Sequence, residues 1–221
     1  HEWLVVGQIH IQAGYKVVFL PLYKSFMDFF ILTYINHTQG IQSGFTFGNF
    51  EDTPKIMLLD TILKTTGYIL AAESKAVHPV GYTNSALIRE VIKKNQVTTI
   101  FQNGERYRAG KLNRQSYSDL AIRWIIDTYC RLNASNRESL VIVPVNISYD
   151  RIYESQNLAI EMINGTKQYY TVFNTLDKMW NLSKDAIGDV YVKYLEPINL
   201  HDYLQANGPT KAELTVPGNF E

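Results

Sequence analysis

The residues best suited to bind an anion lie together in one polar segment of the chain. Four cations occur within nine positions, and they are Arg106, Arg108, Lys111 and Arg114. Only Glu105 offsets them locally. Because a guanidinium group can hold a phosphate through two parallel hydrogen bonds, the cluster suits an anionic ligand. A solvated loop or a contact with another protein is the alternative interpretation.

Asp28 is the other candidate for chemistry, since it follows a hydrophobic run and begins an apolar segment. Ser25 precedes it by three positions, which is the spacing of a capping box at the start of a helix. An acid–base pair would need a histidine beside the carboxylate. None of the 5 histidines has an aspartate five positions later, so no His-x4-Asp sequence occurs in the chain. The pattern therefore predicts a structural role for Asp28.

The composition excludes several classes of protein. The chain has 21 Lys+Arg and 21 Asp+Glu, so its net charge is zero and it has no overall field that would attract nucleic acid. Cys130 is the only cysteine, which excludes an internal disulfide and a multi-cysteine metal site, and we expect a buried, inert thiol. We expect no metal and no cofactor. The longest uncharged stretch, residues 29–50, has polar residues in its middle and is too polar to span a bilayer.

Hydrophobic runs and helical periods alternate along the 221 residues, as they do in α/β proteins. Strands are predicted at residues 16–21, 44–48, 67–71, 97–101, 140–148 and 189–194. Helices are predicted at residues 25–36, 54–66 and 118–132, and a further helix is expected to begin at Asn84 or Ser85. Residues 74–81 and 102–114 are predicted loops. Gly67 is expected at a helix C-cap, and Pro144 at an edge or bulge of its strand.

We therefore predict a single α/β domain with a mostly parallel central sheet flanked by helices. The domain is expected to cover residues 16–205, with an N-terminal extension over residues 1–15 and a peripheral tail over residues 206–221. This size is ordinary for one domain. The chain begins at His1 without an initiator methionine, as a trimmed segment or a processed mature protein would.

Five segments, in order and at suitable spacing, resemble the acyltransferases that act on glycerol phosphate and dihydroxyacetone phosphate. Three of them are Val17-Val-Phe-Leu-Pro-Leu-Tyr-Lys-Ser-Phe-Met-Asp-Phe-Phe, Ile62-Leu-Lys-Thr-Thr-Gly-Tyr-Ile and Phe101-Gln-Asn-Gly-Glu-Arg-Tyr-Arg-Ala-Gly-Lys111. The other two are Val141-Ile-Val-Pro-Val-Asn-Ile-Ser-Tyr-Asp-Arg151 and Gly188-Asp-Val-Tyr-Val-Lys-Tyr-Leu-Glu-Pro-Ile-Asn-Leu200. The resemblance implies an acyltransferase-like fold over most of the chain. It also implies an activity in which a fatty acyl group moves from a thioester carrier to a phosphorylated glycerol backbone.

The basic segment follows the family pattern closely. The resemblance implies that Gly104, Arg106, Arg108 and Lys111 would bind the substrate phosphate, if that function is retained. Asn103, however, stands where the family has a glutamate. The family also has an arginine after the segment that begins at Ile62, where this chain has two alanines, Ala71 and Ala72.

Tyr23 is the main departure, because it stands where the family has its catalytic histidine, and Asp28 still follows five positions later. A phenol with a pKa near 10 is a poor base at neutral pH. Loss of a positioned general base alone costs roughly 10²–10⁴ in rate. We expect Tyr23 to fill the space of the imidazole, with its hydroxyl near Asp28. No residue of this motif is therefore expected to be catalytic.

Three hypotheses follow from this pattern. The first is a catalytically inactive acyltransferase-like domain, a pseudoenzyme that is a structural or accessory subunit of a larger assembly. The second is an active acyltransferase that uses acyl-CoA or acyl carrier protein with an atypical base, and the third is a lipid-binding module without transfer activity. The resemblance to a membrane-associated family implies peripheral membrane attachment, contact with other protein subunits and possible binding of a phospholipid or acyl chain. A mitochondrial, intracellular location is expected with the first hypothesis.

Overall fold

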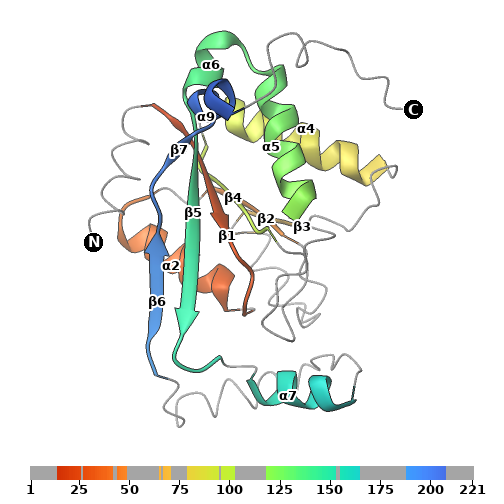
Figure 1. The fold of residues 1–221 in the computed structure, drawn as a ribbon, viewed down its shortest axis with the longest axis vertical. Coiled ribbons are helices and arrows are strands. Elements are labelled where there is room, and N and C mark those ends of the chain that lie inside the picture. Colours follow the sequence, from red (N-terminus) through yellow and green to blue (C-terminus); the bar gives the residue numbers. More distant parts are fainter. Residues whose placement is uncertain are drawn as a thin grey trace.

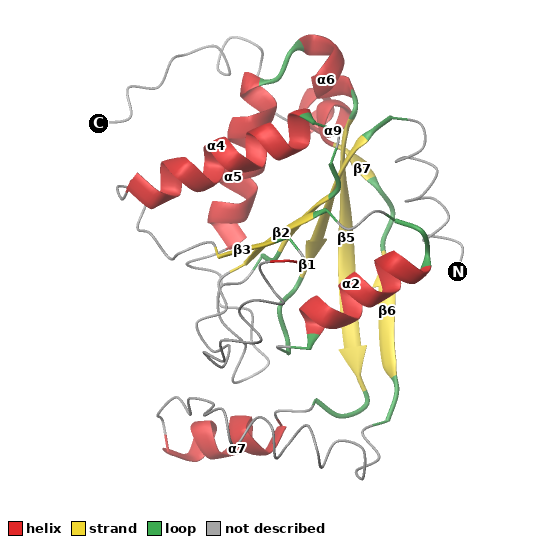
Figure 2. Ribbon diagram, turned by 180° about the vertical axis from the view of Figure 1, so that it is seen from behind, coloured by secondary structure: helices red, strands yellow, loops and turns green. Residues whose placement is uncertain are grey.

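A computed structural model describes residues 14–25, 27–41, 44–48, 65, 67–70, 79–94, 96–102, 118–152, 155–164 and 188–207. Seven strands within these ranges form one sheet, and helices lie on both of its faces (Figures 1 and 2). The strands are β1 Lys16–Pro21, β2 Phe45–Gly48, β3 Tyr68–Leu70, β4 Thr98–Ile100, β5 Leu140–Tyr149, β6 Val190–Tyr194 and β7 Ile198–Asn199. The helices are α2 Asp28–Thr38, α4 Pro79–Lys93, α5 Ser118–Arg131, α6 Ala134–Glu138, α7 Ser155–Asn164 and α9 Leu200–Asn207.

The strand order is β3-β2-β4-β1-β5-β6, and β7 pairs with the other end of β5. Neighbouring strands from β3 to β5 are parallel, whereas β6 and β7 are antiparallel to β5. The prediction of a mostly parallel sheet flanked by helices is confirmed. Because parallel strands point the same way, the segments that follow β1, β4 and β5 leave the sheet at the same edge.

The two faces of the sheet carry separate hydrophobic cores. On one face, α2 packs through Phe29 and Leu32 onto Val17 and Phe19 of β1. On the other face, α4, α5 and α9 cover alternate residues, such as Val18. All six residues of β1 are buried, as expected of a parallel strand with helices on both sides. Helix α7 lies beyond the C-terminal end of β5, away from both layers (Figures 1 and 2).

Most predicted elements are found close to their expected bounds. The strands β1, β2, β3, β4, β5 and β6 and helix α5 each agree to within one or two residues. Helix α2 begins three residues later than expected, at Asp28. Gly67 has the left-handed conformation of a C-cap, with φ of 81°. The helix predicted at residues 54–66 and most of the loop at 102–114 lie outside the described residues.

Three predictions about local structure are wrong. Helix α4 begins at Pro79, so residues 79–81 are helical rather than loop, and neither Asn84 nor Ser85 is its cap. Proline suits this first turn because its missing N–H has no acceptor there in any case. Cys130 is exposed on α5 rather than buried. Partial burial of its thiol nevertheless raises its pKa, which keeps the reactive thiolate scarce at neutral pH.

Pro144 lies in a central strand, at a point where the pairing of β5 changes partner. Residues from Val145 onward pair with β6, and Val141 and Ile142 pair with β7. The backbone N–H of Leu195 donates to the Pro144 carbonyl at 2.9 Å. The N–H that proline lacks therefore falls at an interruption in the ladder, where its absence costs little.

The C-terminal segment contacts both helical layers. In β6, the Tyr194 hydroxyl donates to Asn36 Oδ1 of α2 at 2.7 Å. After β7, Asn199 Oδ1 accepts the backbone N–H of His201 at 2.9 Å, and so caps α9. A hydrogen bond of 2.8 Å joins His201 Nδ1 to the Tyr129 hydroxyl of α5. The chain thus passes from one face of the sheet to the other within a few residues.

Candidate functional site

Tyr23, at the position of the expected histidine, belongs to the hydrophobic core. Its side chain is 1% exposed and lies in the same cluster as Phe29 and Phe101. The rings of Tyr23 and Phe101 meet edge to face, with 5.8 Å between centroids. The prediction that Tyr23 fills the core is confirmed. A side chain this deeply buried cannot meet a substrate without a rearrangement of the loop that carries it.

The Asp28 carboxylate lies at the start of α2 and is fully buried. Its Oδ2 accepts the backbone N–H of Lys24 at 2.6 Å and that of Ser25 at 2.9 Å. In return, Ser25 Oγ accepts the N–H of Met27 at 3.1 Å. The bond from the Ser25 N–H to Asp28 is one half of the predicted capping box, but Ser25 Oγ bonds to Met27 instead of Asp28, and the N-cap residue of α2, Met27, makes no side-chain cap hydrogen bond, so the prediction is only partly correct. Asp28 therefore closes the loop between β1 and α2.

Tyr149, at the end of β5, donates its hydroxyl proton to Asp28 Oδ1. The tyrosine that bonds to the carboxylate is thus Tyr149 and not Tyr23, which corrects the expectation from the sequence. The sequence contained a signal, because Tyr149 lies in the quoted Ser-Tyr-Asp-Arg segment. Spacing alone could not find it, since 121 positions separate the two residues. The parallel pairing of β1 with β5 brings them together.

Lys24 is a second residue that sequence analysis missed. Its ammonium group donates to Asn146 Oδ1 at 3.0 Å and to the carbonyl of Ile147 at 2.5 Å. Both acceptors are uncharged and belong to β5. The Lys24 side chain therefore ties the loop after β1 to β5 from the opposite side of the sheet from Tyr23, and it keeps a positive charge there.

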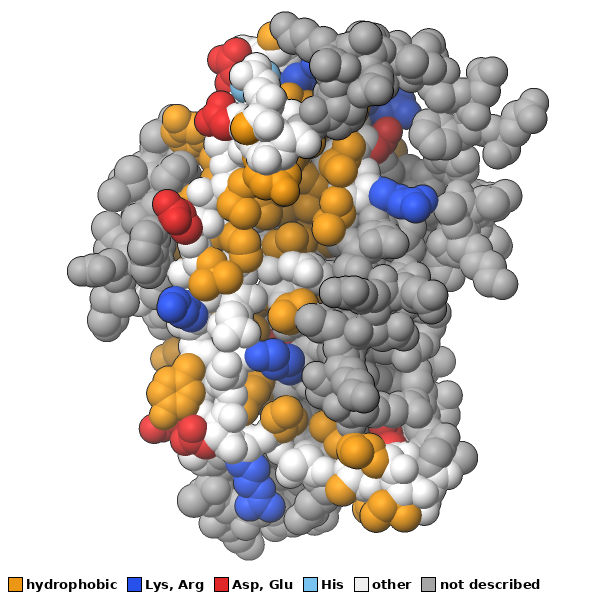
Figure 3. Space-filling model, in the orientation of Figure 1, with side chains coloured by type: hydrophobic (Ala, Val, Ile, Leu, Met, Phe, Trp, Pro, Cys, Tyr) orange, Lys and Arg blue, Asp and Glu red, His pale blue; other side chains and the backbone are white. Residues whose placement is uncertain are grey.

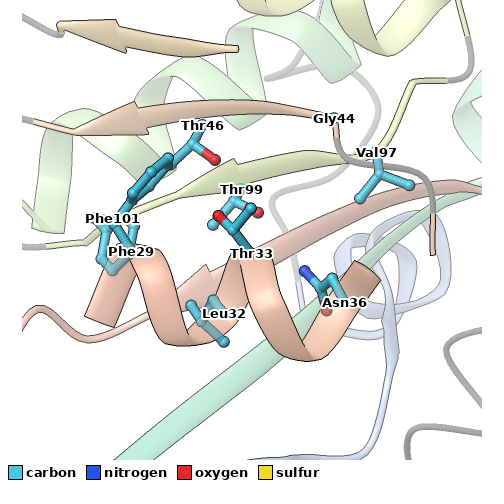
Figure 4. Close-up of a pocket in the computed structure, with 9 residues that line it drawn as sticks. All are labelled: Phe29, Leu32, Thr33, Asn36, Gly44, Thr46, Val97, Thr99 and Phe101. Carbon is cyan, nitrogen blue, oxygen red and sulfur yellow. The ribbon is translucent and has the colours of Figure 1, made fainter. Parts of the chain in front are cut away.

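A small pocket lies between α2 and the sheet (Figure 4). Three threonines, Thr33, Thr46 and Thr99, and Asn36 give it polar lining among apolar side chains. Its volume is about 20 Å³, which is room for about one water molecule. A Cβ at Gly44, on its rim, would lie 1.5 Å from the Val97 carbonyl oxygen, so only glycine fits there. The pocket is too small for an acyl chain or a glycerol phosphate.

The basic segment predicted to bind phosphate lies outside the described residues. This holds for Gly104, Arg106, Arg108 and Lys111, and also for Asn103, Arg114, Ala71 and Ala72. Gln102 is the last described residue before this segment, and its N–H donates to the Pro21 carbonyl at 3.1 Å. The structure therefore brings Tyr23, Asp28 and Tyr149 to one edge of the sheet, and the phosphate-binding prediction stays a prediction.

The described ranges contain neither a metal-binding cluster nor a membrane-spanning helix. No group of three or more His, Cys, Asp or Glu side chains there could hold a metal ion. Among the helices whose placement is known, none is both long and apolar enough to cross a bilayer.

The mostly parallel sheet and the helix that begins with a buried aspartate after its first strand define an acyltransferase-like α/β domain. No protein-family model matches the chain. Curated relatives do match over nearly its whole length. A glycerol-3-phosphate acyltransferase of Pseudomonas fluorescens is 24% identical over 219 residues, covering 98% of this chain and 25% of the relative. Mitochondrial glycerol-3-phosphate acyltransferase 1 of Sus scrofa is 26% identical over 215 residues, covering 93% of this chain and 25% of the relative.

The same mitochondrial protein of Rattus norvegicus is 25% identical over 215 residues. These matches confirm that the chain is related to the glycerol-phosphate acyltransferase family, as its motifs predicted. The chain spans about a quarter of the length of the curated relatives that it matches.

Proposed function

We propose that this chain is a catalytically inactive acyltransferase-like domain that serves as a structural or accessory subunit of a larger, membrane-associated assembly. One observation carries the proposal: Tyr23, at the position of the family's histidine, is 1% exposed and packs in the core. A buried neutral phenol cannot take a proton from an attacking alcohol. Asp28, which would orient a histidine, instead accepts hydrogen bonds from the backbone N–H groups of Lys24 and Ser25.

An acyl-transfer assay tests the proposal. The purified chain is mixed with acyl-CoA or acyl carrier protein and with glycerol 3-phosphate or dihydroxyacetone phosphate. We expect no product above the uncatalysed background. Turnover within about tenfold of an active relative, lost in a Tyr23→Phe variant that still folds, would overturn the proposal in favour of an active enzyme with an atypical base.

The variant Tyr23→His sharpens the assay. We expect no rescue of family-level activity, because Asn103, Ala71 and Ala72 would still be unsuited to the phosphate half of the site. The fold of the variant is checked by circular dichroism, so that a failure to fold is not mistaken for inactivity. A substantial rescue would mean that the rest of the site is intact.

The role as a subunit rests on exposed apolar side chains. On α7, the exposed fractions are 61% for Met162 and 83% for Ile163. A helix of ten residues that leaves such side chains in solvent is typical of a surface that a partner covers. In native extracts, we expect the protein to migrate far above the mass of its own denatured polypeptide, and Ile163→Lys to reduce that native size. Migration of the wild type as a monomer would contradict the subunit role.

We propose a mitochondrial location for the same protein. Relatives from pig and rat are named mitochondrial, while bacterial relatives match equally well. Fractionation of source cells, with detection by a specific antibody, tests the location. Recovery outside mitochondria would reject it and leave the proposed loss of activity unaffected.

A further inference from the structure

Two lysines lie on either side of Asn146, which belongs to the face of β5 that points away from α2. Lys193 of β6 is the direct register partner of Asn146 in β5. Directly opposed residues in antiparallel strands project from the same face, with Cβ atoms about 5 Å apart. Lys24 reaches Asn146 from the other side, with its ammonium group 3.0 Å from Asn146 Oδ1. Asn146 therefore has the Lys24 ammonium group on one side and the Lys193 side chain as its cross-strand neighbour on the other.

Neither of these charges is compensated. In the described part of the chain, neither Lys24 nor Lys193 forms an ion pair with a carboxylate. Lys24 gives two of its three protons to uncharged oxygens and keeps the third. Asp150 and Asp189 lie near Tyr191, where they raise the pKa of its hydroxyl.

Polar donors complete the surroundings of the lysine pair. Ser148 follows Asn146 on the same face of β5, and its Oγ accepts a hydrogen bond of 3.2 Å from Asn146 Nδ2. Tyr191 stands opposite Ser148 in the register and is 56% exposed. Two ammonium groups with nearby hydroxyls suit a dianion with several oxygens better than a single carboxylate. A phosphate monoester carries about −1.5 to −2 charges at pH 7.

The same face becomes apolar on the other side of Asn146. Along β5, the side chains that share its face are Pro144 and Ile142, and Ile198 of β7 is the register partner of Ile142. Ile198 is 39% exposed, and Ile142 and Leu204 are partly buried against the core of this face. Figure 3 shows a broad apolar area here, with separate basic side chains below it.

We propose that Lys24, Asn146 and Lys193 form a binding site for the phosphate group of a phosphate monoester, on the opposite face of the sheet from Tyr23. The site is distinct from the basic segment at residues 103–114 and does not depend on acyl transfer. The apolar residues Ile142, Pro144 and Ile198 continue the site and would receive the hydrocarbon part of a lipid that bears such a headgroup. A soluble phosphate would use the lysine end alone.

Calorimetric titration with three probes tests the site. They are inorganic phosphate, octyl phosphate and octyl glucoside, the last having the same hydrocarbon chain without charge. We expect both phosphates to bind, and octyl phosphate to bind about tenfold or more tightly than inorganic phosphate, because its chain covers apolar surface. Equal binding of the two phosphates would support the site with a free phosphate as its ligand. Binding of octyl glucoside as tight as that of octyl phosphate would overturn it.

Single substitutions test which residues bind the phosphate group. Lys193→Gln, on an exposed side chain, is expected to weaken both phosphates about tenfold, the loss expected for one charge-assisted hydrogen bond. Lys94→Gln, the same change at an exposed lysine just after α4, is the matched control and should have no effect. Ile198→Ser should weaken octyl phosphate alone.

Lys24→Gln should weaken both phosphates as well, but Lys24 also ties a loop to β5, so its fold is checked first. If Lys193→Gln and Lys94→Gln bind phosphate alike, or if neither phosphate binds more tightly than about 10 mM, the proposal is wrong. Acyl-transfer activity of the wild type would overturn the proposed function and leave this site unaffected.

Discussion

The loop after β1 and the open face of β5 and β6 lie on opposite sides of the same two strands, and they use polar groups differently. In the loop, Asp28 is fully buried and its oxygens accept three hydrogen bonds from described residues. On the open face, Lys193 is exposed and has no ion pair within the part of the chain that is described. The polar groups of the loop are thus buried and hydrogen-bonded within the protein, whereas the charge on the other face is exposed.

The comparison predicts that changes in the loop unfold the protein, whereas changes on the open face leave it folded. The largest effect is expected for Tyr23→Ala, because removing a fully buried aromatic ring leaves a cavity in the core. We expect a loss of about 4 kcal/mol in the free energy of unfolding, measured by urea denaturation. Tyr34→Ala is the control, since Tyr34 is 69% exposed on α2. Equal losses for the two variants would contradict the core role of Tyr23.

Asp28→Ala should have the next largest effect. It removes the acceptor of two backbone N–H groups and of the Tyr149 hydroxyl. Because these donors would lose their acceptor inside the protein, we expect the free energy of unfolding to fall by about 3 kcal/mol in total, again measured by urea denaturation. Asp202→Ala, in the first turn of α9, is a matched control with an exposed carboxylate and should cost less than about 0.5 kcal/mol. A stable Asp28→Ala protein would mean that these hydrogen bonds are dispensable.

Tyr194→Phe tests a smaller contribution on the α2 face. The change removes the hydrogen bond to Asn36, and we expect a loss of about 1 kcal/mol at neutral pH. Burial raises the pKa of Tyr194 above its ordinary value near 10. A raised pKa in the folded state means that the stabilisation is complete below pH of about 10 and is lost as the pH rises further.

The free energy of unfolding, measured at neutral and at alkaline pH, tests this predicted loss of stability. The wild type should lose stability more steeply than Tyr194→Phe above pH of about 10. Tyr203→Phe is the comparison variant, because Tyr203 is 54% exposed on α9 and should follow the wild type. Parallel curves for the wild type and Tyr194→Phe would show that the phenol titrates as it does in the unfolded chain.

Lys193→Gln should have the smallest effect on folding. An exposed lysine without an ion pair in the described structure contributes less than about 0.5 kcal/mol to the free energy of unfolding. The same variant is the one expected to lose phosphate binding. If it unfolded as readily as Asp28→Ala, the contrast between the two regions would be false.

The elements of this fold could be predicted from sequence where one local pattern dominates. The runs that became β1 and β5 are hydrophobic over several residues, and Ser25 with Asp28 has the spacing of a capping box. Helix α4 was placed too late because Asn84 and Ser85 are favoured caps, while Pro79 gave a weaker signal for its true start. Several positions have a local preference for the start of a helix, and tertiary packing decides at which of them the helix begins.

The contacts that define the site could be predicted only in part. The burial of Tyr23 followed from its place after a buried strand, but the partners Tyr149 and Asn146 lie 121 and 122 positions away from Asp28 and Lys24. Those pairs depend on the register between β1 and β5, which a single sequence does not specify. Lys193 also escaped notice, because its position opposite Asn146 follows from the antiparallel pairing of β6.

Pro144 has a mechanical consequence for the whole domain. By interrupting the ladder, it divides the C-terminal segment into a lower piece held to α2 through Tyr194 and an upper piece held to α5 through His201. The segment therefore runs along the edge of the sheet and connects the two helical layers. Only the three residues between β6 and β7 separate the part that is held to α2 from the part that is held to α5. Loss of either hydrogen bond would free that part of the segment from its helix, while the parallel strands of the sheet stay paired.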